Sequence, residues 1–234
     1  MKQNIDIIST ASLPDEGLQR LAQHGFHTEV IPFINTYSSV SLSNIQKIRA
    51  LEKYKATVIF SSAHGVEAVA GCLLHTPAWK IACISGQTQK TVEKYFESPD
   101  IIAAAPDAAQ LAEALLNLAE EPVIFFCGSR RLDILPDHFK KAGIGLQEIE
   151  VYRTDLTPTQ INSSNAKAVL FFSTSAVESF FTVNALPEST ICFAIGNTTA
   201  AALKQKVNNE IQIADKPGKK EMIDLVIKYY HEHS

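Results

Sequence analysis

Short hydrophobic runs alternate along the chain with segments in which apolar residues recur every three or four positions. The runs are typical of buried strands, and the wider spacing is typical of helices that cover a sheet. The alternation therefore predicts an α/β fold, in which helices cover both faces of parallel sheets. We expect strands near residues 4–9, 27–33, 57–61, 80–84, 123–127, 146–152, 168–172 and 191–195.

The sequence also contains an internal repeat made of interleaved parts. The stretch "VIFSSAHGVEAVAG" beginning at residue 58 matches "VLFFSTSAVESFFT" beginning at residue 169. A repeat of βα segments predicts two doubly wound domains of similar design. The matching pairs are 58–71 with 169–182, 81–95 with 191–205, and 17–36 with 134–154.

The domain boundaries depend on where the chain crosses between the two copies. Two similar extended segments, 29–37 and 148–156, indicate crossings at both places. One domain then comprises 1–35 with 154–234 and the other comprises 36–153, joined by a two-stranded connector. A sequential division would give domains of nearly equal size as well, so the repeat alone leaves both arrangements open.

Four predicted strands end in turns rich in hydroxyl groups. In parallel α/β sheets, ligands bind beyond the carboxyl ends of the strands, and the helix N-termini that follow attract anions. Helix capping alone explains Ser and Thr at such places, and Ser175 with Glu178 fits an S-x-x-E capping box. Gly86 and Gly196 favour ligand binding, because glycine permits a close approach to the backbone. The turns lie at 61–65, 85–89, 173–176 and 196–199.

Composition narrows the classes of function. The chain has 234 residues, of which 46% are hydrophobic and 20% charged, and its net charge of -4 argues against general nucleic-acid binding. No signal peptide is recognisable, and no run approaches the roughly 20 apolar residues of a membrane helix. We therefore expect a cytoplasmic protein with no membrane or nucleic-acid partner.

Cofactor and metal motifs are missing from the sequence. The four cysteines form no C-x-x-C pair and three stand in strand-like runs, which predicts buried thiols. No Cys or carboxylate constellation accompanies the histidines, so we expect no metal site. Neither a G-x-G-x-x-G fingerprint nor a P-loop is present, which disfavours a nucleotide cofactor, a dehydrogenase and a methyltransferase.

Four stretches together resemble the uroporphyrinogen-III synthase family. They are "VIFSSAHGVEAV", "CGSRRLDILPDHFKKAGIGLQEIEVYRT", "AVLFFSTSAVESFF" and "CFAIGNTTAAAL", in the family's order and over nearly the whole chain. The resemblance implies two flavodoxin-like domains, a two-stranded connector and an active site in the cleft between the domains. It also implies a cofactor-free lyase of heme biosynthesis, expected as a monomer, which cyclises hydroxymethylbilane to uroporphyrinogen III with loss of water and inversion of ring D.

The resemblance also implies site residues. Tyr152 in "EVYRT" matches the family's cleft tyrosine, which assists loss of the substrate hydroxyl, although an amphipathic residue on a connector strand is the alternative. The sequence departs from the family's pattern at His64 and Gln89. The substrate-binding candidates come from the hydroxylated turns and one arginine-containing segment: Ser61, Ser62, Gly86, Thr88, Arg130, Ser173, Thr174, Ser175, Gly196, Asn197, Thr198 and Thr199.

A second class of function stays open from the sequence. Two duplicated α/β domains with a hinge also suit a non-catalytic module that binds a small anionic ligand. Tyr152 and the Gly-x-Thr-Thr-Ala turn that begins at Gly196 favour the enzyme, because a binding module needs neither.

Overall fold

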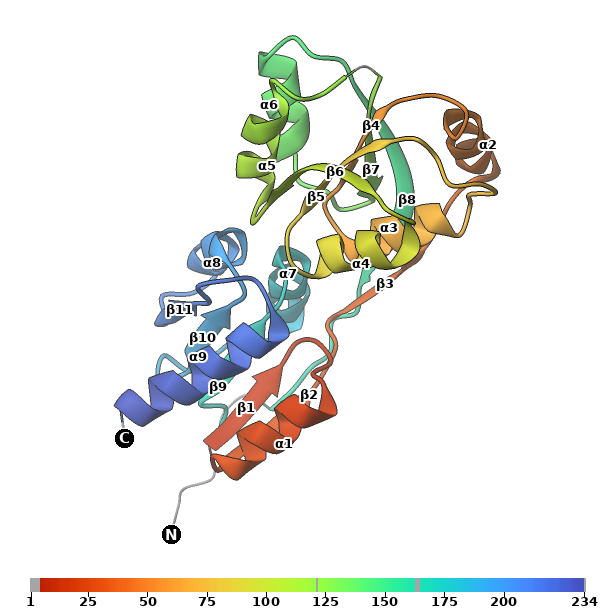
Figure 1. Ribbon diagram of the computed structural model, residues 1–234. Helices are drawn as coiled ribbons and strands as arrows, with labels where there is room; N and C mark the ends of the chain where they lie inside the picture. The colour runs from red at the N-terminus through yellow and green to blue at the C-terminus, as the bar shows by residue number, and fades with distance from the viewer. Residues whose placement is uncertain (1–4, 121, 163–164, 234) are drawn as a thin grey trace. The chain divides into compact units, whose positions relative to one another are not determined.

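The computed structural model describes residues 5–120, 122–162 and 165–233 (Figure 1). Residue 4, where the first predicted strand begins, lies outside them. The chain divides into two compact units, each with its own sheet of mainly parallel strands. Unit 1 comprises Met1–Asn35 with Asp155–Ser234, and unit 2 comprises Thr36–Thr154.

Unit 1 has a five-stranded sheet in the order β11-β10-β9-β1-β2, with parallel pairing throughout. Its strands are β1 (Ile5–Ser9), β2 (Phe26–Val30), β9 (Ala168–Phe171), β10 (Ile191–Ala194) and β11 (Ile211–Ile213). Its helices are α1 (Asp15–Gln23), α7 (Thr174–Val183), α8 (Asn197–Lys204) and α9 (Lys219–Glu232).

Alternate side chains of this sheet build two cores. Ile7 and Leu170 belong to the core formed with α1 and α9, whereas Ile8 and Val169 belong to the core formed with α7 and α8. Successive residues of a strand point to opposite faces, so a strand that is apolar throughout requires helices on both sides. Unit 1 is therefore doubly wound.

Unit 2 has a six-stranded sheet in the order β3-β8-β7-β4-β5-β6. Its strands are β3 (Ile34–Ser38), β4 (Thr57–Phe60), β5 (Lys80–Ile84), β6 (Asp100–Ala105), β7 (Val123–Gly128) and β8 (Leu146–Leu156). Its helices are α2 (Leu42–Leu51), α3 (Ala63–Ala70), α4 (Gln87–Tyr95), α5 (Ala108–Leu115) and α6 (Ile134–Lys141). Helices α3 and α4 cover one face and α5 and α6 the other, as the two separate cores of this unit require.

The two sheets share one topology. From one edge, unit 1 runs β2-β1-β9-β10-β11 and unit 2 runs β8-β7-β4-β5-β6, with β3 added at the end. When each strand of unit 2 is given the number of its repeat counterpart in unit 1, the order in both sheets is 2-1-3-4-5, which is the flavodoxin-like arrangement. In unit 2 the chain forms β4, β5 and β6 before β7 and β8. The predicted fold class is thereby confirmed, and the interleaved sequence repeat has its counterpart in the sheets.

Strands β3 and β8 run antiparallel beside each other. The Ser39 amide donates to the Val151 carbonyl at 3.1 Å, and the hydroxyl groups of Thr36 and Thr154 lie 3.0 Å apart. Both strands contain a boundary between the units, at residues 35–36 and 154–155. Pro32 precedes β3 and has no amide hydrogen to donate, so the predicted strand at 27–33 is interrupted there.

Three strands were not predicted from the pattern. Strand β3 was expected only as part of the extended segment 29–37. Strand β6 is rich in alanine and only partly buried, and β11 has three residues, all partly buried. Both are edge strands, which carry a weak hydrophobic signal because one side of each has no neighbouring strand.

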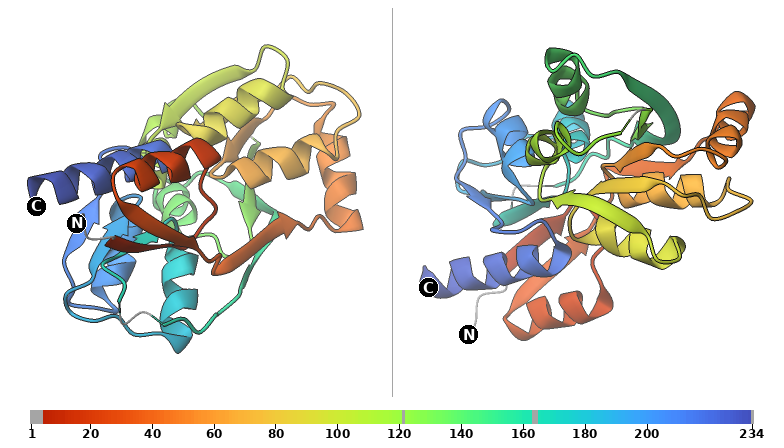
Figure 2. Two further views of the ribbon diagram at one scale, coloured as in Figure 1. Left: turned by 90° about the horizontal axis from the view of Figure 1, so that it is seen from below. Right: turned by 45° about the horizontal axis from the view of Figure 1, so that its top comes forward.

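The first and last helices of the chain pack side by side in unit 1. Helices α1 and α9 lie beside each other (Figure 2). Arg20 of α1 forms an ion pair with Asp224 of α9, and Nδ1 of His24 lies 3.0 Å from Nε2 of His231. Segments from opposite ends of the sequence thus cover the same face of one sheet. Within the described residues, no helix is long and apolar enough to cross a membrane.

All four cysteines are buried free thiols, which confirms the burial expected from their strand-like surroundings. Burial raises the pKa of the Cys83 and Cys127 thiols to about 11 and that of Cys192 to about 12, from 9.0. In the unfolded chain these thiols ionise near their ordinary pKa.

We expect the free energy of unfolding to fall as the pH rises from 9 to 12. Over that range the unfolded thiols lose protons that the folded chain still holds, so alkaline pH favours unfolding. For Cys192 the loss at pH 10 is about 1 kcal/mol. Urea unfolding of the wild type and of Cys192→Ala, each at pH 7.5 and pH 10, measures this loss of unfolding free energy. An equal loss in both proteins would contradict this origin.

Candidate active site

Tyr152 is aimed by an irregularity in the pairing of β7 with β8. The register is regular up to Cys127, which pairs with Glu150, but Gly128 pairs with Tyr152, so β8 has one extra residue. A bulge of this kind turns the following side chain to the other face of the sheet. As a result both Val151 and Tyr152 contact the core beneath α3.

The Tyr152 side chain lies at the start of α3. Its phenol interacts with the hydroxyls of Ser61 and Ser62, which follow β4, and its ring centroid is 6.1 Å from that of His64. Strands β4 and β7 are neighbours, although β4 occurs much earlier in the chain. The phenol therefore occupies the topological switch point of the unit 2 sheet, where ligands bind in such folds.

Burial is the main influence on the acidity of this phenol. It raises the pKa of Tyr152 above 10, while hydrogen bonds from Ser62 and Ser61 lower the pKa in part. The phenol is consequently protonated at neutral pH and can donate a proton or a hydrogen bond. The same two hydroxyls can stabilise the phenolate that a proton transfer would leave.

Serine caps begin two of the four helices that follow the hydroxylated turns. The Ser62 hydroxyl accepts from the His64 amide at 3.3 Å, and the Ser173 hydroxyl accepts from the Ala176 amide at 3.1 Å. For these two serines the capping interpretation is correct. The predicted capping box at Ser175 is wrong, because α7 already begins at Thr174 and Ser173 is its N-cap.

Glycines begin the other two helices. Gly86 precedes α4 and Gly196 precedes α8, and neither helix has a side-chain cap. Their first amide groups are thus not satisfied by a capping side chain, which is the arrangement that binds anions at helix N-termini. Gly86 has φ of 83°, whereas Gly196 is extended at φ of −179° and a Cβ there would meet no atom within 4 Å.

The remaining predicted residues differ in exposure. In unit 1, Thr174 and Ser175 are partly exposed and Asn197 and Thr198 exposed, at the carboxyl ends of the adjacent strands β9 and β10. Thr88 and Thr199, by contrast, are 6% and 4% exposed. Both stand in the first turn of a helix but direct little surface outward.

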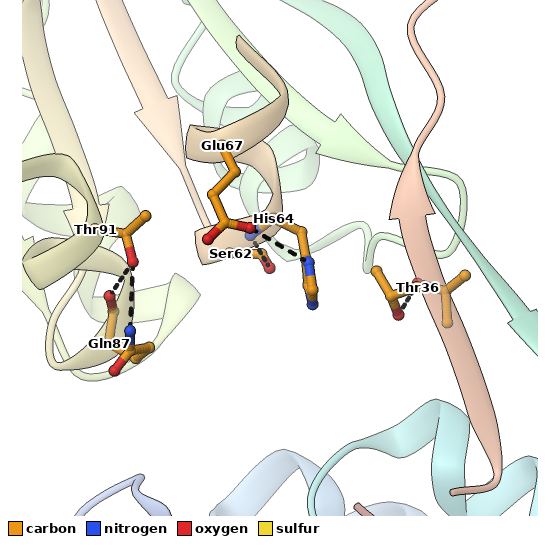
Figure 3. Close-up of polar contacts among 7 residues, drawn as sticks. Thr36, Ser62, His64, Glu67, Gln87 and Thr91 are labelled. Carbon is orange, nitrogen blue, oxygen red and sulfur yellow. Dashed lines mark hydrogen bonds and ion pairs between the residues drawn. The ribbon is translucent and has the colours of Figure 1, made fainter. Parts of the chain in front are cut away.

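Figure 3 shows how the polar side chains at this end of unit 2 are tied to their own helices. On α3, His64 faces Glu67, with Nδ1 and the carboxylate oxygen 3.9 Å apart. On α4, the Thr91 hydroxyl donates to the Gln87 carbonyl at 2.8 Å. Each of these contacts joins two residues of the same helix, near its first turn.

Two arginines follow β7. Arg130 is exposed. Arg131 forms ion pairs with Glu148 and Asp133, and these partners raise its pKa. Arg131 is thus neutralised within unit 2.

Within the ranges that the structure describes, no three His, Cys, Asp or Glu side chains gather where they could hold a metal ion.

Sequence reasoning missed the residues that surround the Tyr152 ring. Gly65 of α3 and Gly128 of β7 both lie against it. The glycine that ends "VIFFCG" could have indicated a close approach to the backbone of β7. That Tyr152 is the residue opposite Gly128 follows from the bulge in β8, which no local sequence pattern predicts.

A comparison with known protein families gives one match over most of the chain. Residues 15–224 match the family described as uroporphyrinogen-III synthase HemD. The chain belongs to the uroporphyrinogen-III synthase family. The sequence resemblance is thereby confirmed, and the function follows the family: an enzyme of tetrapyrrole biosynthesis that cyclises hydroxymethylbilane to uroporphyrinogen III.

Solved structures of uroporphyrinogen-III synthases share the fold. A mutant enzyme from Thermus thermophilus has a TM-score of 0.69 and 15% identity, covering 98% of this chain and 100% of that chain. The Helicobacter pylori uroporphyrinogen-III synthetase has a TM-score of 0.66 and 16% identity, covering 96% and 99%. The wild-type Thermus enzyme in a second crystal form has a TM-score of 0.53 and 14% identity, covering 98% and 99%.

Proposed function

We propose that the chain acts as a cyclising hydro-lyase on hydroxymethylbilane and that Tyr152 assists loss of the substrate hydroxyl. The observation that supports this role is the position of the phenol at the switch point of the unit 2 sheet, protonated and beside two serine hydroxyls. The two serine hydroxyls hydrogen-bond the phenol in the free protein, and they follow β4 at the edge of the sheet where ligands bind in such folds.

The proposed chemistry begins with the hydroxymethyl group of ring A. The carbon–oxygen bond breaks as the pyrrole nitrogen supplies electrons, and the phenol of Tyr152 gives its proton so that the hydroxyl leaves as water. Ser61 and Ser62 stabilise the phenolate by hydrogen bonding. The substituted carbon of ring D then attacks the azafulvene, and the spiro intermediate fragments and recloses. The proton released at closure restores the phenol.

The helix N-termini supply the second part of the proposal. Each ring of the substrate carries an acetate and a propionate, and the uncapped amides of α4 and α8 are suited to carboxylates. Holding a polyanion in one fold is catalysis by positioning, because the closure that inverts ring D requires a specific arrangement of the chain ends. We assign carboxylate contacts to the residues next to Gly86 and Gly196.

The location, the oligomeric state and the place of substrate binding are predicted from the sequence alone. The predicted cytoplasmic location and monomeric state, and binding of the substrate between the domains, stay predictions. Size-exclusion chromatography with light scattering tests the monomer.

The product isomer tests the proposed function. Hydroxymethylbilane closes without catalysis to the symmetric type I ring, whereas the proposed reaction gives type III. Purified protein is mixed with fresh hydroxymethylbilane, and the oxidised products are separated by chromatography. Predominantly type III product supports the proposal. Binding of the tetrapyrrole with only type I product would instead favour the non-catalytic binding module.

We expect Gly196→Ala to weaken substrate binding without loss of stability. The backbone there suits alanine and the added methyl enters open space in the free protein, so only a bound ligand would meet it. Loss of one charge-assisted contact raises KM roughly 10- to 100-fold. Gly145→Ala is the matched control, since its Cβ also meets no atom within 4 Å. An unchanged KM in Gly196→Ala would place the carboxylates elsewhere.

A further inference from the structure

Gly128 is the last residue of β7, and its backbone does not need glycine. Among the described glycines, a left-handed φ occurs at Gly25, Gly86 and Gly143 only. Gly128 therefore has a conformation that alanine adopts without strain. A glycine weakens a strand, and it often marks a place where another group approaches the backbone closely.

The Tyr152 ring is what approaches. A Cβ built at Gly128 would lie within 3.0 Å of three ring atoms, Cδ2, Cε2 and Cζ, with Cδ2 at 2.8 Å. Such contacts essentially do not occur in proteins, and the ring as a whole would have to move. The ring of Tyr152 thus covers the backbone of Gly128 and fills the place of its missing side chain.

The rest of the surroundings leaves the ring little freedom. On its other edge, a Cβ at Gly65 would lie 3.6 Å from Cε1, an ordinary contact distance. The backbone of Tyr152 is held by the Ser129 amide, which donates to its carbonyl at 3.1 Å. The Ser129 hydroxyl in turn accepts from the Thr154 amide at 3.2 Å. The bulge and these bonds fix the chain, so the ring position depends on the space above Gly128.

We propose that Gly128 is a positioning residue for the reaction: its missing side chain lets the Tyr152 ring lie on β7, which brings the phenol to Ser61 and Ser62. This inference rests on the proposed role of Tyr152. A Cβ at position 128 lifts the ring from the strand and separates the phenol from the two hydroxyls.

Gly128→Ala tests the proposal by kinetics and by titration of the phenol. We expect kcat to fall about as far as in Tyr152→Phe, on the order of 100-fold, with a smaller change in KM. Titration of the Tyr152 phenol is followed as the difference in ultraviolet absorbance between matched proteins with and without Tyr152. In Gly128→Ala the phenol should titrate closer to pH 10, because it is less buried. Gly17→Ala, which adds a methyl to a buried glycine of unit 1, should leave kcat and the titration unchanged.

The double variant Gly128→Ala/Tyr152→Phe separates positioning from general damage. If Gly128 acts through the phenol, the double variant has the kcat of Tyr152→Phe alone, because the two effects are not additive. Multiplying effects, or an undiminished kcat in folded Gly128→Ala, would overturn the proposal.

If Gly128→Ala folds poorly, the contact is tested by comparing the loss of melting temperature that Gly128→Ala causes in two backgrounds, a stability cycle. In a Tyr152→Ala background the opposing ring is gone, so Gly128→Ala should lower the melting temperature far less than in the wild type. An equal loss in both backgrounds would mean that the strand itself needs glycine, and the proposal would be wrong. A wild type that forms no type III product would instead refute the proposed function, while the titration and the stability cycle still report the contact.

Discussion

Tyr152→Phe is expected to slow turnover of hydroxymethylbilane about 100-fold while the protein stays folded. The substitution removes the phenol oxygen and keeps the ring on Gly128, so the packing survives and the proton donor is lost. General acid assistance is worth about 10²–10⁴-fold, and the azafulvene forms readily without help, which favours the lower end. The measurements are kcat and the ratio of type III to type I product, which should fall because spontaneous closure competes with a slow enzyme.

Two comparisons make this result specific. Thermal melts of both proteins exclude misfolding, and KM should change little because phenylalanine keeps the shape of the site. Thr199→Ala should cost less than Tyr152→Phe, since the backbone donors of α8 remain. A folded Tyr152→Phe protein with unchanged rate and product ratio would contradict the role of Tyr152. Catalysis would then depend only on the geometry in which the substrate is bound.

Phe126→Ala is expected to destabilise unit 2 by about 3–5 kcal/mol, because it empties a fully buried site. The Phe126 ring stacks on Phe60 with centroids 5.4 Å apart and lies 5.8 Å from Trp79. Trp79 is the single tryptophan of the chain and is buried in this core. Its fluorescence during urea unfolding therefore follows the loss of stability in unit 2.

The matched control is Phe180→Ala in unit 1. Phe180 is also fully buried and contacts Phe33 and Phe171, with centroids 5.0 and 5.3 Å away. Because each unit has its own cores, Phe180→Ala should shift the circular-dichroism transition and leave the Trp79 transition in place. If both probes shifted equally in both variants, the units would unfold as one.

The strands with the clearest sequence signal are buried on both faces. In β4, β7, β9 and β10 nearly every residue is apolar because helices cover both sides, and such runs are visible without an alignment. The edge strands β6 and β11 gave no comparable signal. The helix start expected at Ser175 was wrong by two residues, because Ser173 is the cap.

The site was predictable in kind but not in geometry. Hydroxyl groups and glycines after strands are a local pattern, and Tyr152 came from a family resemblance. Which face Tyr152 points to depends on one extra residue in β8 relative to β7, and register is a property of two strands together. The contact of Tyr152 with Gly128 follows from that register, so it had no local sequence signal.

The discontinuous course of unit 1 bears on how the protein is made. On the ribosome, β1, α1 and β2 emerge before unit 2, whereas β9, the inner neighbour of β1, does not begin until Ala168. At about 5–20 residues per second this delay is on the order of 10 s. Unit 2 is one continuous stretch and can fold during that time. The nascent chain then carries a folded unit 2 behind an unpaired, apolar first segment, which is the kind of surface that chaperones bind.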